Sequence, residues 1–155
     1  MDYFQGVVTD YLRAKRSRFV NTEYMINLDV DGIYGKDRHW YCDTVAIDFA
    51  DSTIHLCEIT YAKTLHPVSK RLQFWCNHWS EVVAALYRDS SLKGDWEVSP
   101  RVFIPFTLKK QLTDRVSALK WPEPVREANA YADRHDFGGS APVEVPLLER
   151  RAVRQ

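Results

Sequence analysis

Residues 39–61 read HWYCDTVAIDFADSTIHLCEITY, and they predict the fold more clearly than any other stretch of the chain. Side chains that alternate along 39–49 are typical of a strand with one buried face. Ala50-Asp51-Ser52 has the composition of a turn, and residues 53–61 are rich in the β-branched and aromatic types that favour strands. Because so short a loop joins neighbouring strands, the segment is predicted to form an antiparallel hairpin.

The register of this hairpin decides which side chains meet. We expect Phe49 to pair near Ile54. Continued along the two strands, this register places Asp43 opposite Thr60. Directly opposite residues share a face, so Asp43 and Glu58 are predicted to lie diagonally on one largely apolar face. Burying a carboxylate is costly unless it is paired or binds a cation.

The segments around the hairpin show helical or strand periodicity. The predicted helices are 3–19, 67–88 and 108–120, and the further predicted strands are 23–30 and 96–106. The order is therefore roughly α-β-β-β-α-β-α. This order predicts an α/β (α+β) fold with a central hairpin, in which helices cover one mixed sheet.

The chain of 155 residues is 45% hydrophobic and 13% aromatic, which indicates one folded domain spanning 1–155. Its core is expected within 3–120, and the proline-rich residues 121–155 are expected to form a loosely packed extension. No apolar run is long enough for a membrane helix, and the first residues lack a signal-peptide pattern. These features predict a cytoplasmic protein without a membrane partner. The odd number of cysteines favours free thiols over disulfides.

Asp43 and Glu58 form the candidate chemical site. Two converging carboxylates offer the hard oxygen ligands that Mg²⁺ or Mn²⁺ prefers. Such a cation lowers the pKa of bound water and stabilises charge on a phosphoryl oxygen. A structural interpretation stands beside this one: Asp43 caps a strand end or pairs with a buried base, and Glu58 pairs with Lys70 or Arg71. The sequence alone leaves both interpretations open.

The pattern resembles the PD-(D/E)xK nuclease superfamily, which has the restriction-endonuclease-like fold. In that family an Asp lies on the second strand of a meander, and an acidic residue followed two positions later by Lys lies on the third. Cys42-Asp43-Thr44 is similar to the first element and Leu56-Cys57-Glu58-Ile59-Thr60 to the second, and the resemblance covers roughly 3–106. It implies a Mg²⁺-dependent nuclease in which Asp43 and Glu58 hold the metal.

The chain departs from the family pattern at Thr60, where the family has Lys. The resemblance implies that a migrated lysine, Lys63 or Lys70, replaces it. Glu23 is similar to the additional acidic ligand that many members contribute near the first helix.

A basic set is expected to line a groove for the phosphates of a nucleic acid. Its members are Arg13, Lys15, Arg16, Lys70 and Arg71. Two other functions stay open. One is a catalytically inactive protein on the same scaffold that binds a protein or forms a homodimer, and the other is an enzyme using cysteine and histidine. A zinc set of Cys42, Cys57, Cys76 and His78 lacks the usual C-x-x-C spacing.

Overall fold

The computed structural model describes residues 3–29, 38–92, 95–119, 131–132 and 142–146. In chain order the elements are α1 (Tyr3–Arg13), β1 (Arg18–Asn27), β2 (His39–Asp48), β3 (Thr53–Ile59), α2 (His66–Asn77), α3 (Trp79–Ser90), β4 (Glu97–Pro105), the 3₁₀ helix η1 (Phe106–Leu108), α4 (Lys109–Ser117), β5 (Tyr131–Ala132) and β6 (Pro142–Pro146).

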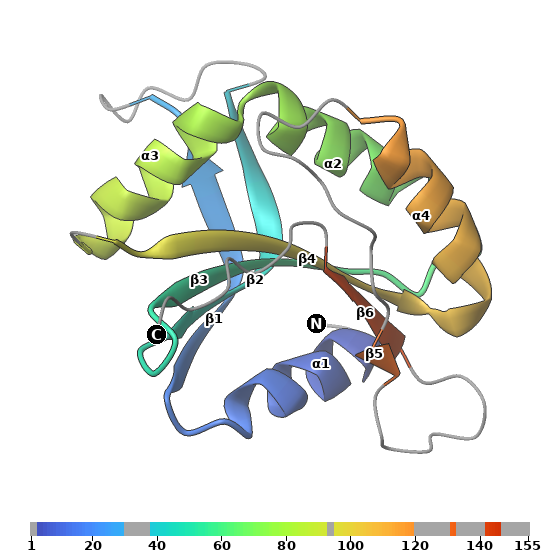
Figure 1. The fold of residues 1–155 in the computed structure, drawn as a ribbon, viewed down its shortest axis with the longest axis horizontal. Coiled ribbons are helices and arrows are strands. Elements are labelled where there is room, and N and C mark those ends of the chain that lie inside the picture. Colours follow the sequence, from blue (N-terminus) through green and yellow to red (C-terminus); the bar gives the residue numbers. More distant parts are fainter. Residues whose placement is uncertain (1–2, 30–37, 93–94, 120–130, 133–141, 147–155) are drawn as a thin grey trace.

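One mixed sheet organises these elements in the order β1-β2-β3-β4-β6-β5. Strands β1, β2 and β3 form an antiparallel meander, and β4 is parallel to β3. A parallel neighbour requires a crossover connection, which α2 and α3 supply. Helix α1 lies on one face of the sheet, and α2, α3 and α4 lie on the other (Figure 1). The predicted α+β class with a mixed, helix-covered sheet is confirmed.

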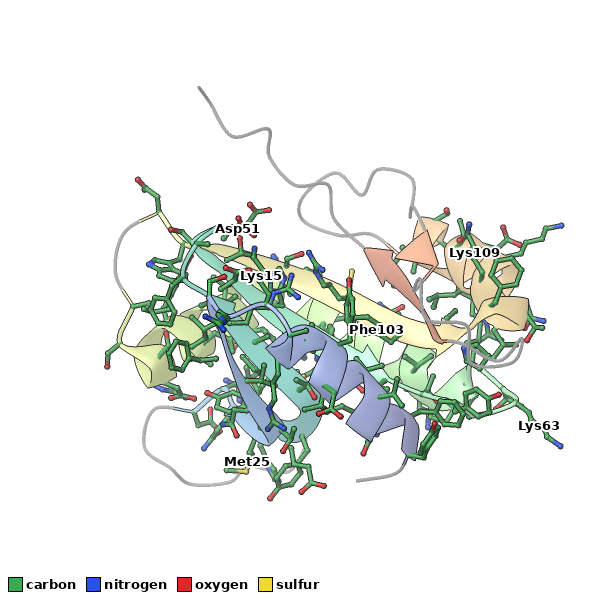
Figure 2. All side chains as sticks on the ribbon, turned by 90° about the horizontal axis from the view of Figure 1, so that it is seen from below. Lys15, Met25, Asp51, Lys63, Phe103 and Lys109 are labelled. Atoms are coloured by element: carbon green, nitrogen blue, oxygen red, sulfur yellow. The ribbon has the colours of Figure 1, made fainter. Side chains whose placement is uncertain are left out.

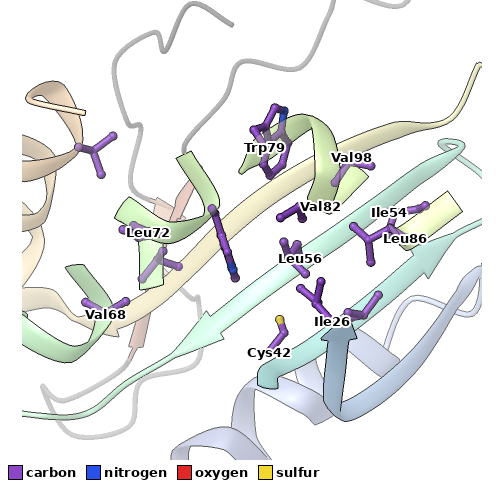
Figure 3. Close-up of a cluster of buried hydrophobic side chains, with 14 of the residues drawn as sticks. Ile26, Cys42, Ile54, Leu56, Val68, Leu72, Trp79, Val82, Leu86 and Val98 are labelled. Carbon is purple, nitrogen blue, oxygen red and sulfur yellow. The ribbon is translucent and has the colours of Figure 1, made fainter. Parts of the chain in front are cut away.

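Each face of the sheet has its own hydrophobic core. The larger core joins the sheet to α2, α3 and α4, with Leu56, Leu72 and Val82 among its buried side chains (Figure 3). The smaller core packs Val8 and Leu12 of α1 against the opposite face. Trp75 and Trp79 are both buried in the larger core, as the helical spacing of the apolar residues predicts.

Two predicted helices differ from the observed ones. Helix α1 ends at Arg13, and β1 already begins at Arg18, because residues 18–23 alternate between exposed and half-buried as a strand does. The predicted helix 67–88 is two helices that meet at His78, whose φ of −120° and ψ of 24° end the helical path. The break allows α2 and α3 to take different directions across the sheet, so that each buries its own tryptophan.

Strands β5 and β6 fall within residues 121–155, for which only a loose extension is predicted. Strand β6 pairs antiparallel with β4, and β5 pairs with β6. The other residues of the predicted extension lie outside the described residues.

The β2–β3 hairpin has a register two residues away from the predicted one. Asp48 pairs with Thr53, whereas the prediction pairs Phe49 with Ile54. The cause lies in the turn, because Asp48 Oδ1 accepts hydrogen bonds from the main-chain N–H groups of Ala50 at 3.0 Å and Asp51 at 3.3 Å. These bonds begin the turn directly after Asp48, so the strand ends one residue earlier than its alternation indicates.

Asp48 also joins the hairpin turn to the segment that follows α1. Its carboxylate accepts hydrogen bonds from Ser17 Oγ at 2.9 Å and Arg18 Nε at 3.1 Å, and it lies 2.8 Å from Lys15 Nζ. Burial alone would raise the pKa of Asp48, but the bonds from Lys15, Ser17 and Arg18 outweigh it and hold that pKa well below its usual range. The ionised carboxylate therefore stabilises the fold.

We predict that Asp48→Asn destabilises the protein by about 2–4 kcal/mol at pH 7, because it leaves the cationic and N–H donors around this buried position without their anion. A lowered folded-state pKa gives stability that is present above the unfolded-state pKa of about 4 and is lost as the pH falls below it. Urea unfolding from pH 7 to pH 3 therefore shows a steeper loss of stability in the wild type than in the variant.

The matched control is Asp51→Asn, which removes a carboxylate with 38% exposure that pairs with the same lysine. We expect it to cost at most about 0.5 kcal/mol, as exposed pairs usually do. Equal losses in the two variants would contradict the role assigned to Asp48.

Candidate functional site

Asp43 and Glu58 come together where the β2–β3 ladder ends. The last paired residues are Thr44 and Cys57, and Asp43 and Glu58 are the next residues beyond the end of that ladder. The prediction that Asp43 lies opposite Thr60, diagonal to Glu58, is therefore wrong, because the register of the hairpin is shifted by two residues. The main-chain N–H of Ile59 donates to Asp43 Oδ2 at 2.8 Å, and the Asp43 side chain thereby takes the place of a main-chain acceptor.

A guanidinium from α2 lies against both carboxylates. Arg71 Nη1 is 2.6 Å from Glu58 Oε2 and 3.7 Å from Asp43 Oδ2. On the other side Gln5 of α1 donates from Nε2 to Asp43 Oδ1 at 3.2 Å. The site is therefore assembled from two strands and the helices on both faces of the sheet. The ion pair between Glu58 and Arg71 is one of those that the sequence predicts.

The three charged side chains differ sharply in exposure. Glu58 has 0% exposure and Asp43 15%, whereas Arg71 retains 43%. Solvent therefore reaches the guanidinium and the edge of Asp43, while Glu58 lies beneath them. Arg71 is therefore the member of the cluster that a ligand in solvent can contact first.

The charge in this cluster is not balanced. Burial raises the pKa of Glu58 well above its usual range, and the nearby Asp43 adds to this effect, while Arg71 opposes it. Glu58 Oε1 is buried and accepts no hydrogen bond from the described residues. With both carboxylates ionised and one guanidinium between them, the group carries a net negative charge. A proton or an additional cation would restore neutrality.

The fit to a divalent cation rests on these two carboxylates. They are hard oxygen ligands, and a buried carboxylate oxygen without a donor is available to a cation. Within residues 3–29, 38–92 and 95–119, no group of three or more His, Cys, Asp or Glu side chains is arranged to hold a metal. A cation bound here would therefore have two protein carboxylates and otherwise water, an arrangement that Mg²⁺ accepts.

Glu23, the predicted additional ligand, lies on the strand next to Asp43, but it does not form a metal-binding group of three with Asp43 and Glu58. It lies on β1 between the pairs Thr22–Thr44 and Tyr24–Cys42, which places it level with Asp43. Its φ of 54° is in the left-handed region, which is unfavourable for a residue with a Cβ atom. The strand pairing is interrupted at this one position.

The two predicted lysines do not reach the carboxylates. Lys63 and Lys70 are exposed and form no ion pair with a described residue, and Figure 2 shows Lys63 extending into solvent. At about 100° per residue, Arg71 lies about 60° around α2 from the buried Val68, whereas Lys70 lies about 160° from it. This helical geometry is the signal in the sequence that favours Arg71.

The five basic residues predicted to line one groove are not brought together. Lys15 pairs with Asp48 and Asp51 at the hairpin turn, just after the C-terminal end of α1. Arg13 is the last residue of that helix, and Arg16 follows Lys15. Gln5, near the N-terminal end, contacts Asp43. The 11 residues of α1 span about 16 Å, which separates this group from Lys70 and Arg71.

The cysteines do not support a thiol chemistry. Cys42, Cys57 and Cys76 are free and buried, and burial raises the pKa of Cys42 and Cys76, which disfavours the reactive thiolate. Cys42 lies in the larger core and Cys57 in the smaller one, so the two thiols do not share a face of the sheet. The Cys42 thiol instead donates to the Cys57 carbonyl oxygen at 3.1 Å.

No protein-family model, curated protein or solved structure gives a match to this chain. The site is therefore interpreted from its own geometry. Among the described helices, none has the length and apolar character needed to cross a membrane.

The pKa of Glu58 predicts how two substitutions differ. A raised folded-state pKa gives stability that is full below the unfolded-state value of about 4.3 and is lost as the pH rises through the folded value. Glu58→Gln removes this loss, so at pH 8 it should be as stable as the wild type or up to about 2 kcal/mol more stable. Arg71→Gln removes the opposing charge and should cost about 1–2 kcal/mol at pH 8, with a smaller cost at pH 5.

Denaturant unfolding at pH 5 and pH 8 measures both effects. Lys70→Gln is the matched control for Arg71, because it removes the neighbouring exposed cation. A loss of more than about 2 kcal/mol in Glu58→Gln at pH 8 would identify a stabilising ion pair and contradict the unbalanced charge described above.

Proposed function

We propose that this chain is a PD-(D/E)xK-like, Mg²⁺-dependent phosphodiesterase that acts on nucleic acid. The element order supports this proposal, because an antiparallel meander is followed by crossover helices and a parallel fourth strand. The observation that carries it is the approach of Asp43 and Glu58, on the second and third strands, to the same helix-borne cation, Arg71. This arrangement resembles the restriction-endonuclease-like fold, with Arg71 as the cation that lies against the two carboxylates.

Asp43 and Glu58 would hold the Mg²⁺, which supplies a more acidic bound water and stabilises charge on a phosphoryl oxygen. The hydrogen bonds from Ile59 and Gln5 fix the orientation of the Asp43 carboxylate. Glu58 is desolvated, so its interaction with any cation is stronger than it would be in water.

Arg71 would provide the positive charge that Thr60 cannot provide. Its guanidinium is always protonated and has paired N–H groups that match a phosphate. Its partial exposure allows it to leave Glu58 and contact a phosphate oxygen of the substrate. This role differs from that predicted for Lys63 and Lys70, neither of which lies against the carboxylates.

A second candidate is a catalytically inactive protein on the same scaffold, which would bind a protein partner or a second copy of itself. The observation that favours it is the short contact of 2.6 Å between Arg71 and Glu58. A guanidinium held there partly neutralises the carboxylates without any metal.

Titration calorimetry with Mn²⁺ and cleavage of plasmid, linear and single-stranded DNA and RNA test the proposal. We expect the wild type to bind Mn²⁺ at one site. Asp43→Asn and Glu58→Gln should each bind Mn²⁺ at least about tenfold more weakly, and each should cleave nucleic acid about 100-fold or more slowly. Asp51→Asn, a distant acidic control, should leave both unchanged.

Arg71 variants separate the two candidates. Under the proposal, Arg71→Gln binds Mn²⁺ more tightly, because it removes a competing cation, but it no longer cleaves the substrate. Arg71→Lys retains part of the cleavage activity. If neither the wild type nor Arg71→Gln binds Mn²⁺ or cleaves any substrate, the phosphodiesterase is rejected and the inactive scaffold is favoured.

A further inference from the structure

A group of aromatic rings adjoins the carboxylate site. Phe4 and Tyr61 are stacked with centroids 3.4 Å apart and an angle of 8° between the ring planes. Tyr3 meets Phe4 edge-on, with centroids 5.4 Å apart. Tyr61 follows two residues after the end of β3, and Phe4 precedes Gln5, which contacts Asp43. Phe4 and Tyr61 are therefore each close in sequence to a residue of the carboxylate site, Phe4 to Gln5 and Tyr61 to Glu58.

These rings are accessible. Tyr3 has 68% exposure and Tyr61 37%, while Phe4 is half-buried between them and the protein. A ring that is already held in place loses little conformational entropy when a flat partner stacks on it. We call Tyr3, Phe4 and Tyr61 the aromatic platform.

The chain beside the platform is positively charged. Residues 59–80 contain no Asp or Glu, and they carry Lys63, Lys70 and Arg71. Lys63 and Lys70 are exposed and form no ion pair with the described part of the chain. Lys63 extends from the end of the molecule opposite Lys15 and Asp51 (Figure 2). A polyanion whose bases stack on Tyr61 would therefore find unpaired cations within the same segment.

We propose that the aromatic platform stacks the bases of single-stranded nucleic acid and that Lys63 and Lys70 bind its phosphates. This substrate class rests on the proposed function, because the platform would guide the strand toward Asp43 and Glu58. A duplex fits less well, since its bases are already stacked inside the helix and cannot reach an exposed ring. Stacking accepts any base, so little sequence preference is expected.

Equilibrium binding of a fluorescent 15-nucleotide oligo(dT) in EDTA tests the platform without any catalysis. We expect Tyr61→Leu to weaken binding by about 5- to 100-fold, as the loss of one stacked base does, and Tyr61→Trp to retain it. Phe19→Leu is the control, because Phe19 is an exposed aromatic residue outside the platform, with 66% exposure against 68% for Tyr3, and it contacts Phe49 instead. It should change the affinity less than about twofold.

Tyr3→Leu provides an independent test if Tyr61→Leu folds poorly, since Tyr3 is the most exposed of the three rings of the platform. The double variant Lys63→Gln/Lys70→Gln should lower the salt dependence of binding, with the slope of log K against log[salt] reduced by about 1.4. An unchanged slope would overturn the assignment of these two lysines as phosphate contacts.

Three results would overturn the platform: Tyr61→Leu and Phe19→Leu behaving alike, duplex binding as tightly as the single strand, or no binding to the oligonucleotide. Binding that depends on Tyr61 without any cleavage would sustain the platform and reject the phosphodiesterase. Cleavage of duplex DNA that is unaffected by Tyr61→Leu would support the phosphodiesterase and reject the platform.

Discussion

The buried carboxylate of Asp48 accepts hydrogen bonds from two N–H groups of the turn that follows it, Ala50 and Asp51. These bonds determine where β2 ends and therefore which residues of β3 lie opposite it. Counting back along the ladder from Asp48 and Thr53 leads to its last pair, Thr44 and Cys57, beyond which Asp43 and Glu58 follow. The geometry of the candidate site is thus a consequence of a turn at the other end of the hairpin. A shift of two residues would leave Glu58 opposite an apolar side chain.

Asp48 and Glu58 are both fully buried, yet their energetic roles are opposite. Asp48 has five donors around it and a lowered pKa, as expected of a carboxylate that stabilises a fold. Glu58 has one cation, one oxygen without a donor, and a raised pKa. Groups retained at a cost to stability are candidates for function. This contrast within one hairpin is the main physical reason for treating Asp43 and Glu58 as a site rather than as a structural ion pair.

The hairpin, the helices and the mixed sheet could be predicted because hydrophobic periodicity and turn residues are local signals. The register could not, since it depends on a side-chain hydrogen bond that Asp48 makes with its own turn. The break at His78 also escapes periodicity, because Trp75 and Trp79 fit one continuous helical stripe. In the site, the two carboxylates could be predicted from their strand positions. Of the two partners that the sequence leaves open for Glu58, the angle around α2 favours Arg71 over Lys70. The roles of Lys63 and Lys70 as replacements for the missing lysine rest on the family resemblance alone.

Arg71 connects stability and chemistry in this structure. It partly neutralises a costly pair of carboxylates, and it is exposed enough to be displaced by a stronger cation. The most direct test is an anomalous difference map from crystals of the wild-type protein grown with Mn²⁺. The account predicts one peak between the Asp43 and Glu58 carboxylates, with the Arg71 guanidinium turned away from Glu58. A map without that peak, with Arg71 still bound to Glu58, would contradict it.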